Sequence, residues 1–265
     1  MKRYLNKNLA IILLLAGIIF TGCEKVIDLE LDNSDPVLVI EGGVSNRLEY
    51  QLVRISKTIP FDEKTRFNPF SGAVVTLSSS DGKNFTYSEV SPGIYQTEVF
   101  RGVPGVKYTL DVLAEGKQYT ATSEMPQPVK LDSINLKKFS FFGDTNTYAA
   151  ANYIDPVSVQ NQYRFILKVK DKIEEESVTE DRFNDGNTVS EVIFYELDDL
   201  KKGDRIDVEM QCIDRAVFKY FFALSQIDGN GGPPVAPANP VSNFSNGALG
   251  IFNAYTSNKQ SLVIK

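Results

Sequence analysis

Cysteine has the most definite chemistry in this chain, and only one of its two copies lies in a reactive pattern. Cys23 follows three basic residues near the start, an apolar run from Leu9 to Phe20, and the small residue Gly22. This order is typical of a lipoprotein signal peptide, and the run is too short to span a bilayer. We expect the Cys23 thiol to receive a diacylglycerol, residues 1–22 to be cleaved, and the new amino terminus to be acylated, for example with palmitate. The alternative is an ordinary secretory signal with an incidental cysteine.

The second cysteine, Cys212, shares one strand face with Ile206, Val208 and Met210, because polar residues occupy the positions between them. We therefore expect a small core residue. A reactive thiol needs an exposed, electropositive setting, and the sequence contains no histidine to act as its base. The absence of histidine also excludes the Ser-His-Asp and Cys-His classes and the common zinc sites. We predict a protein that is not an enzyme and has no cofactor.

Carboxylates are the other candidate chemistry, and they are densest in residues 171–187. Charge runs usually face water, so we expect a solvated loop. The more specific alternative to a solvated loop is a calcium-binding loop. An EF-hand register starting at Asp181 fails, however, because Phe183 occupies a ligand position and Val192 stands where a bidentate glutamate is needed. We predict no metal site.

The charge of the chain bears on its partners. Removal of residues 1–22 takes away three positive charges, so a formal net charge of −6 becomes −9. An acidic surface repels phosphate backbones, and no cluster of Lys and Arg with interleaved aromatic residues offsets this. We expect no nucleic-acid partner. With Cys23 lipidated, Cys212 has no cysteine to pair with, so packing alone must stabilise the fold.

The elements that would position these residues are mainly strands. Seven short β-rich segments between residues 37 and 121, separated by turn signals such as Asp81-Gly82 and Glu115-Gly116, predict a β-sandwich. Residues 23–35 form a polar tether ahead of it. Two prolines, Pro126 and Pro128, interrupt the strand pattern and mark a boundary. We therefore expect an immunoglobulin-like or prealbumin-like sandwich over 36–125, a linker at 126–131, and a second β-rich, sandwich-like domain over 132–265.

The second domain is expected to contain one short amphipathic helix. Asp214 can cap it, and Val217, Phe221 and Leu224 follow at helical spacing, with Phe218 and Phe222 broadening the apolar face toward the core. A long loop rich in Gly and Pro follows at 229–245. Long ordered loops are often functional, which makes Asn239, Asn243 and Phe244 candidate ligand-binding residues. The equal alternative is a loop that only spans one end of the sandwich.

Two family resemblances extend this interpretation. The segments Ser71–Val75, Pro92–Tyr95 and Gly105–Leu110 resemble prealbumin-like modules of carboxypeptidase regulatory regions, which implies a spacer or adhesion element. The whole chain resembles the Bacteroidota outer-membrane lipoproteins with domain of unknown function 4249. That second resemblance rests on these segments: Cys23–Leu29, Val39–Gly42, Ser91–Tyr95, Gly102–Gly105, Pro237–Pro240, Ser242–Asn243, Asn246–Gly250 and Phe252–Tyr255. Gly231–Pro234 departs from the family pattern of Asn-Pro followed by an aromatic residue.

The resemblance implies a lipid-anchored protein of the outer membrane that accompanies a TonB-dependent transporter, and it supplies no catalytic residues. Acidic residues after the lipidated cysteine direct such proteins to the cell surface. Here a single acidic residue, Glu24, follows Cys23 before the basic residue Lys25, so the surface signal is incomplete. Both the cell surface and the periplasmic face of the outer membrane therefore stay as alternatives, with the surface slightly favoured. Asp132-Ser133-Ile134 resembles an O-glycosylation site of the same phylum, with Ser133 as the acceptor.

Three hypotheses about function follow. The first, which we favour, is a non-catalytic accessory or substrate-capture subunit of a TonB-dependent transporter. The second is a free-standing glycan or peptide binding module that uses exposed aromatic residues among Tyr148, Tyr153 and Phe244 as a stacking platform. The third is a hydrolase with paired carboxylates from residues 171–187, which requires carboxyl groups about 5 to 10 Å apart in a cleft.

Overall fold

The computed structural model describes residues 35–60, 67–141, 143–227 and 239–265 of the chain. The lipidation candidate Cys23 and most of the 229–245 loop lie outside these ranges. The protein is mainly β, and residues 36–265 form one compact unit. No helix in the described ranges has the length and apolar character needed to cross a bilayer.

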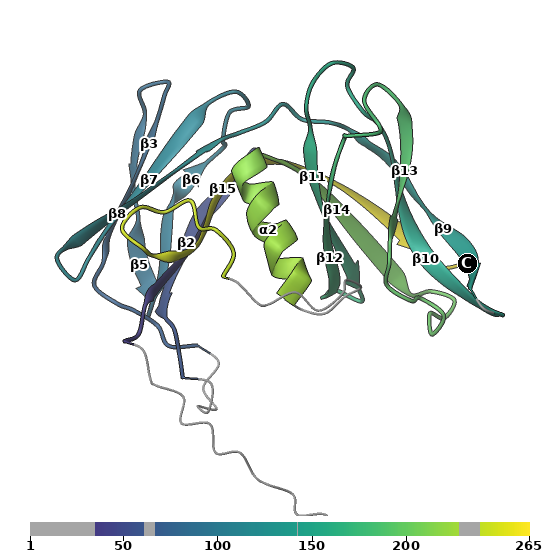
Figure 1. Cartoon of the computed structure of the whole chain (residues 1–265), viewed down its shortest axis with the longest axis horizontal. Coiled ribbons are helices and arrows are strands. Elements are labelled where there is room, and N and C mark those ends of the chain that lie inside the picture. The colour runs from purple at the N-terminus through teal and green to yellow at the C-terminus, as the bar shows by residue number, and fades with distance from the viewer. Residues whose placement is uncertain (1–34, 61–66, 142, 228–238) are drawn as a thin grey trace, which may run out of the picture. The chain divides into compact units, whose positions relative to one another are not determined.

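Most of the longer strands in the first half of this unit alternate buried and exposed residues, as a half-buried sheet requires. Figure 1 shows how all the strands of this half are arranged. These strands are β1 (Leu38–Ser45), β2 (Glu49–Lys57), β3 (Val74–Ser79), β4 (Asn84–Thr86), β5 (Ser88–Ser91), β6 (Ile94–Phe100), β7 (Lys107–Ala114) and β8 (Lys117–Glu124). The expected hairpin at Glu115-Gly116 is confirmed. Both residues have positive φ, 52° and 73°, as the tight turn between β7 and β8 requires.

The second half adds further strands and the only helix in the described residues. The elements are β9 (Leu131–Phe141), β10 (Asp144–Ile154), β11 (Gln162–Val169), β12 (Lys172–Glu180), β13 (Thr188–Ile193), β14 (Arg205–Ile213), α2 (Arg215–Ile227) and β15 (Leu249–Val263). The expectation of a solvated loop at 171–187 is wrong for its first half, because β12 pairs antiparallel with β11 at the edge of a sheet. The charged side chains of an edge strand can still face water.

Three sheets form two sandwiches. An eight-stranded sheet has the order β12-β11-β14-β15-β1-β2-β6-β5, and the other two have the orders β4-β3-β7-β8 and β13-β10-β9. In the first sandwich, Ile40 and Tyr95 of the large sheet share a core with Leu77 and Leu110 of the four-stranded sheet. The second core joins residues of β11 and β14 to residues of β9, β10 and β13. The large sheet therefore serves both sandwiches.

Strand β15 joins the two sandwiches because it is long enough to pair with a different neighbour in each half. Residues 249–255 pair parallel with β1, and residues 256–263 pair antiparallel with β14. Figure 1 shows this strand, yellow and labelled β15, crossing from one sandwich to the other. Phe252 and Ala254 of β15 lie in the first core. The expected domain ranges differ from the structure here, since a segment assigned by sequence order to the second domain completes the first sandwich.

Candidate functional site

Helix α2 begins as the sequence predicts. The Asp214 carboxylate accepts hydrogen bonds from the backbone N–H groups of Ala216 and Val217 at 2.8 and 3.0 Å, which satisfies the first turn. Val217 is buried in a small third cluster with Ile213 and Ile251 on the large sheet. The expected packing of the helix's aromatic residues against the core is incomplete toward the end of the helix. Phe222 remains half exposed, because only one side of the helix contacts the sheet.

Cys212 is confirmed as a core residue. Its side chain is buried in the second core, where its Sγ accepts a hydrogen bond from the Val129 N–H at 3.3 Å. Burial raises the pKa of this thiol, so the reactive thiolate is disfavoured at neutral pH. The described part of the chain therefore presents no nucleophilic cysteine.

The aromatic platform expected for a glycan or peptide site is wrong. Tyr148, Tyr153 and Phe244 are all buried, with exposed fractions of 8%, 1% and 7%. Tyr153 lies in the second core against Tyr163, with ring centroids 4.9 Å apart, and Phe244 lies in the first core. None of the three rings can stack on a ligand in solution.

The loop candidates mostly have structural partners. The amide of Asn243 pairs with the backbone of Phe252, donating to the carbonyl at 2.8 Å and accepting from the N–H at 2.9 Å. This pairing fastens the end of the loop to β15. Asn239 is exposed at the edge of the described range, so ligand binding there stays a prediction. Ser133 is exposed on β9, where its hydroxyl accepts a hydrogen bond from Asn152, and its glycosylation also stays a prediction.

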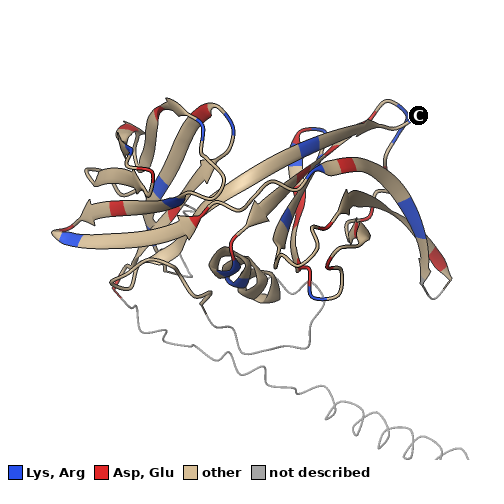
Figure 2. Cartoon of the chain, turned by 90° about the horizontal axis from the view of Figure 1, so that it is seen from above, with Lys and Arg blue, Asp and Glu red and all other residues tan. Residues whose placement is uncertain are grey.

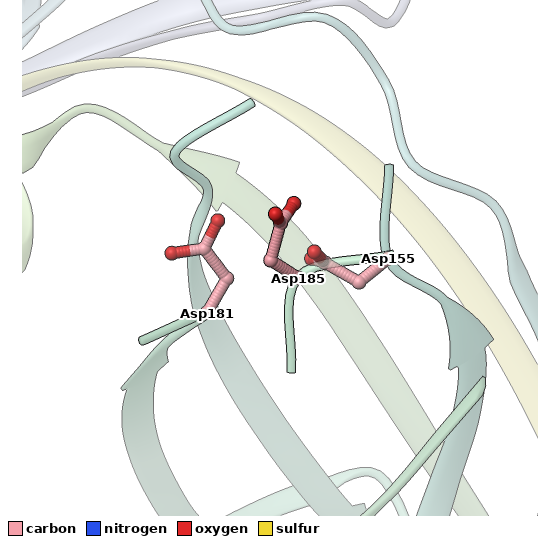
Figure 3. A group of neighbouring side chains, drawn as sticks. All are labelled: Asp155, Asp181 and Asp185. Carbon is pink, nitrogen blue, oxygen red and sulfur yellow. The ribbon is translucent and has the colours of Figure 1, made fainter. Parts of the chain in front are cut away.

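Three carboxylates converge at one end of the second sandwich. Asp155 follows β10, Asp181 follows β12, and Asp185 lies in the turn before β13. One oxygen from each lies within 4.8 Å of the corresponding oxygens of the other two (Figure 3). We call these residues the carboxylate cluster. Asp155 and Asp181 are buried, whereas Asp185 is exposed.

Asp155 has the least usual surroundings of the three. Its Oδ1 accepts a hydrogen bond from the Tyr163 hydroxyl at 2.5 Å. Its Oδ2 is buried and has no hydrogen-bond partner among the described residues. Loss of solvation raises the pKa of Asp155, and the neighbouring carboxylates of Asp181 and Asp185 raise it further, against the lowering effects of the Tyr163 hydroxyl and of the Gly186 backbone N–H.

The other two carboxylates hold two loops together. Asp181 accepts a hydrogen bond from the Asn161 N–H at 2.8 Å, and Asp185 accepts one from the Ser158 N–H at 2.6 Å. Each bond joins the β12–β13 turn to the segment between β10 and β11. The sequence gives no local sign of this arrangement, because Asp155 is 26 residues away from Asp181 and reaches it only through the pairing of β10 with its neighbours.

A groove of about 500 Å³ lies between α2 and the end of β12. We call it the α2 groove. Its lining residues are Val178, Thr179, Glu180, Arg182, Phe183, Arg215, Phe218, Lys219 and Phe222. Phe183 is 88% exposed and Phe222 is 50% exposed. Large aromatic side chains so accessible to water are typical of interaction surfaces.

The groove and the carboxylate cluster share one short segment. Asp181 and Asp185 belong to the cluster, whereas Arg182 and Phe183, between them in sequence, line the groove. Any ligand that fixes the two aspartates therefore also fixes the backbone that carries the most exposed aromatic ring of the groove.

The family model named "Domain of unknown function (DUF4249)" matches residues 24–261 of the chain. None of the curated proteins compared with the chain matches it. Two solved structures are similar to parts of the chain. A two fibronectin type-III domain segment from chicken tenascin is 16% identical, with 67% of this chain and 91% of that chain covered and a TM-score of 0.22. The adhesin InvE of Yersinia pseudotuberculosis is 17% identical, with 67% and 55% covered and a TM-score of 0.22.

Proposed function

We propose, from the premise that the chain belongs to the DUF4249 family, that it is a non-catalytic lipoprotein of the bacterial outer membrane. In this proposal the acylated Cys23 anchors it in the lipid bilayer, with the cell surface slightly favoured over the periplasmic face. The folded part acts as an accessory or substrate-capture subunit of a TonB-dependent transporter. No nucleic acid and no cofactor take part.

The observation that carries this proposal is the α2 groove. It combines exposed aromatic rings with the cationic side chains of Arg182, Arg215 and Lys219, of which Arg182 pairs with Glu180 at 2.6 Å. Aromatic and arginine side chains are enriched at the centres of protein interfaces. The positive charge fits an acidic segment of the transporter that also inserts an apolar side chain between the rings.

Charge elsewhere on the protein makes the groove distinctive. Lys and Arg alternate with Asp and Glu over both sandwiches, as Figure 2 shows, and the chain as a whole is acidic. A local excess of positive charge beside exposed rings therefore favours one docking orientation over others, because electrostatic complementarity sets register and suppresses wrong partners.

A non-catalytic function is supported because the commonest catalytic base is absent from the sequence and the candidate nucleophile is buried. The sequence has no histidine, and Cys212 is enclosed in the core. The carboxylate cluster makes a poor pair for a glycoside hydrolase, because two of its three carboxylates are buried and out of reach of a sugar chain.

Affinity purification of the full lipidated chain from its own outer membrane in mild detergent tests the proposal. We expect a TonB-dependent barrel to co-elute in stoichiometric amount, identified by mass spectrometry. The Phe183→Ala variant should reduce recovery of the barrel at least tenfold, which corresponds to about 1.4 kcal/mol of binding free energy. A matched control is Phe194→Ala, which removes a 68% exposed phenylalanine that does not line the groove.

Two results would contradict the accessory-subunit proposal. One is a lipoprotein that elutes alone under mild conditions, and the other is equal recovery of the barrel with Phe183→Ala and with the control. The second candidate function, a free-standing glycan or peptide binding module, would then gain support from the exposed rings of Phe183 and Phe222. Calorimetry of the isolated chain with a panel of glycans and acidic peptides would test that module directly.

A further inference from the structure

We infer that Asp155, Asp181 and Asp185 form a calcium-binding site that closes one end of the second sandwich. This inference does not depend on the proposed transporter partner. It concerns a cation bound by the isolated chain, and it starts from the convergence of three carboxylates from two segments that are distant in the sequence, as Figure 3 shows.

The buried oxygen of Asp155 points to a ligand independently of that convergence. Asp155 is 1% exposed, its Oδ2 has no partner among the described residues, and its carboxylate is directed toward Asp185 in Figure 3. A buried acceptor without a partner costs about 1 to 3 kcal/mol, and more when it is charged. Buried carboxylates in proteins are therefore paired with a cation or coordinate a metal.

No side-chain cation provides that pairing in the described part of the chain. The ion pairs there involve other carboxylates, and none includes a member of the cluster. The contrast with Glu209 is instructive, because that buried carboxylate lies 2.8 Å from the Lys259 ammonium. The cluster thus concentrates negative charge that only a bound cation can neutralise without taking up protons.

The donor set selects the cation. Carboxylate oxygens suit the hard ions calcium and magnesium rather than zinc or copper. Calcium binds oxygens at 2.3 to 2.6 Å, so two oxygens on opposite sides of the ion lie about 4.6 to 5.2 Å apart, whereas magnesium, at 2.0 to 2.1 Å, allows only about 4.2 Å. The three oxygens lie within 4.8 Å of one another, which the calcium sphere accommodates. Magnesium also gives up its water reluctantly and is seldom held by several protein carboxylates at once, so this donor set favours calcium. Backbone carbonyls and water would complete the six to eight ligands that calcium takes.

The site is not an EF-hand, and this explains how the sequence conceals it. Asp181 and Asp185 come from one turn, but the third carboxylate comes from the end of β10 rather than from the same loop. Phe183, which breaks the EF-hand register, is free to lie in the α2 groove because it is not a ligand.

Titration calorimetry and thermal unfolding of the full lipidated chain in detergent, after EDTA treatment and dialysis, test the inference. We expect one calcium ion per chain, a dissociation constant of about 1 mM or tighter, and a melting temperature that rises with calcium chloride. Magnesium chloride should bind at least tenfold more weakly. The Asp185→Asn variant should bind calcium at least tenfold more weakly than the natural chain, while Asp144→Asn, an exposed substitution at the far end of β10, should match the natural chain.

The Asp155→Asn variant provides a second test of the calcium site. It removes the buried charge, so its melting temperature in EDTA should equal or exceed that of the natural chain while its response to calcium is lost. If that variant does not fold, the exposed Asp185→Asn substitution carries the test alone. The inference is overturned if the natural chain gives neither binding heat nor a calcium-dependent melting shift. It is also overturned if Asp185→Asn binds calcium as tightly as Asp144→Asn, since the ion would then bind elsewhere.

Discussion

The two sandwiches have similar architecture but differ in what they bury. The buried polar residues of the first sandwich are neutral: Ser45, Gln51, Thr97, Ser123 and Asn253. The second sandwich and its sheet edges instead bury the carboxylates of Asp155, Asp181 and Glu209. Buried charge is costly to maintain unless it has a partner. The comparison therefore separates a sandwich whose polar groups serve packing from one that carries groups able to bind a ligand.

Several neutral polar side chains of the first sandwich are engaged within the chain, although the Tyr87 hydroxyl and the Asn253 amide oxygen are buried without a partner among the described residues. The Gln51 side chain accepts a hydrogen bond from the Ser45 N–H at 2.8 Å and donates one to the Phe100 carbonyl at 3.0 Å. Ser123 accepts from the Ala254 N–H at 2.9 Å. The bonds to Phe100 and Ala254 join strands that are distant in sequence. The first sandwich thus acts as a framework into which the strands next to both ends of the described chain are fastened.

Breaking that framework should have the largest effect. Gly250 has φ of +93°, and a Cβ added there would lie 2.1 Å from the Ile40 carbonyl oxygen. Gly250→Ala should therefore separate β15 from β1 and cost about 5 kcal/mol or more in the free energy of unfolding. Urea unfolding followed by tyrosine fluorescence measures this, since the sequence contains tyrosine but no tryptophan.

The matched control for this substitution is Gly203→Ala in the second sandwich. Gly203 has nearly the same φ, +94°, but no atom lies within 4 Å of its added Cβ. The control isolates the cost of the backbone conformation, about 1 to 2 kcal/mol. Equal losses for the two variants would show that the close approach of β15 to β1 contributes nothing.

An intermediate effect is expected at the contact between α2 and the first sandwich. Asp214 caps α2 with one oxygen, and its other oxygen accepts a hydrogen bond from the Ser123 hydroxyl of β8. Asp214→Ala should cost about 2 kcal/mol, because the cap and the cross-link are lost together. Asp214→Asn, which keeps an acceptor for the cap, should cost less. A variant as stable as the exposed control Asp144→Ala would contradict both roles.

The smallest expected effect is a pH dependence of the stability that Glu89 gives to the first sandwich. Hydrogen bonds from Ser71 and from the backbone N–H groups of Gly72 and Gly93 lower the pKa of Glu89 from 4.5 to about 2. Because the folded pKa is the lower one, the stabilisation is complete above pH 4.5 and is lost as pH falls toward 2.

Melting temperatures of the natural chain and of Glu89→Gln measure this contribution. The two should differ most above pH 4.5 and converge as pH falls toward 2. Glu98→Gln, an exposed substitution on β6, is the control. A constant difference between the natural chain and Glu89→Gln across this range would show that ionisation of Glu89 does not stabilise the fold.

The fold was largely predictable from the sequence where strand patterns were strong. The alternation around Cys212 placed it correctly on an apolar strand face, and Asp214 was correctly identified as a helix cap. Strand β12 was missed for a physical reason. Its hairpin turn uses Lys170 and Asp171, both with positive φ, instead of a glycine pair, and its side chains are mostly charged because it lies at a sheet edge.

The candidate site was less predictable, because its members meet only after long-range pairing. Nothing near Asp155 in sequence indicates that it lies beside Asp181. The exposure of the aromatic residues was predicted wrongly because local sequence does not reveal tertiary burial. Phe244 lies between the polar residues Asn243 and Ser245, and Tyr153 directly follows Asn152, yet tertiary packing buries both rings. The exposed rings of the α2 groove are Phe183 and Phe222. Phe183 lies just after the charged edge strand β12, and Phe222 lies on the helix that packs through only one side, and the sequence patterns described both elements incompletely.

The parallel pairing of β1 with β15 has a mechanical consequence. Seven residue pairs, from Val39 with Leu249 to Ser45 with Tyr255, join the two strands in the same direction. Tension applied to the start of β1 along its axis, while the far end of β15 is held, would load these hydrogen bonds in shear. They would bear the force together, whereas an antiparallel hairpin pulled apart at its open end loses its bonds one at a time. A protein tethered through residues just before β1 would thus resist pulling best in the direction of its tether.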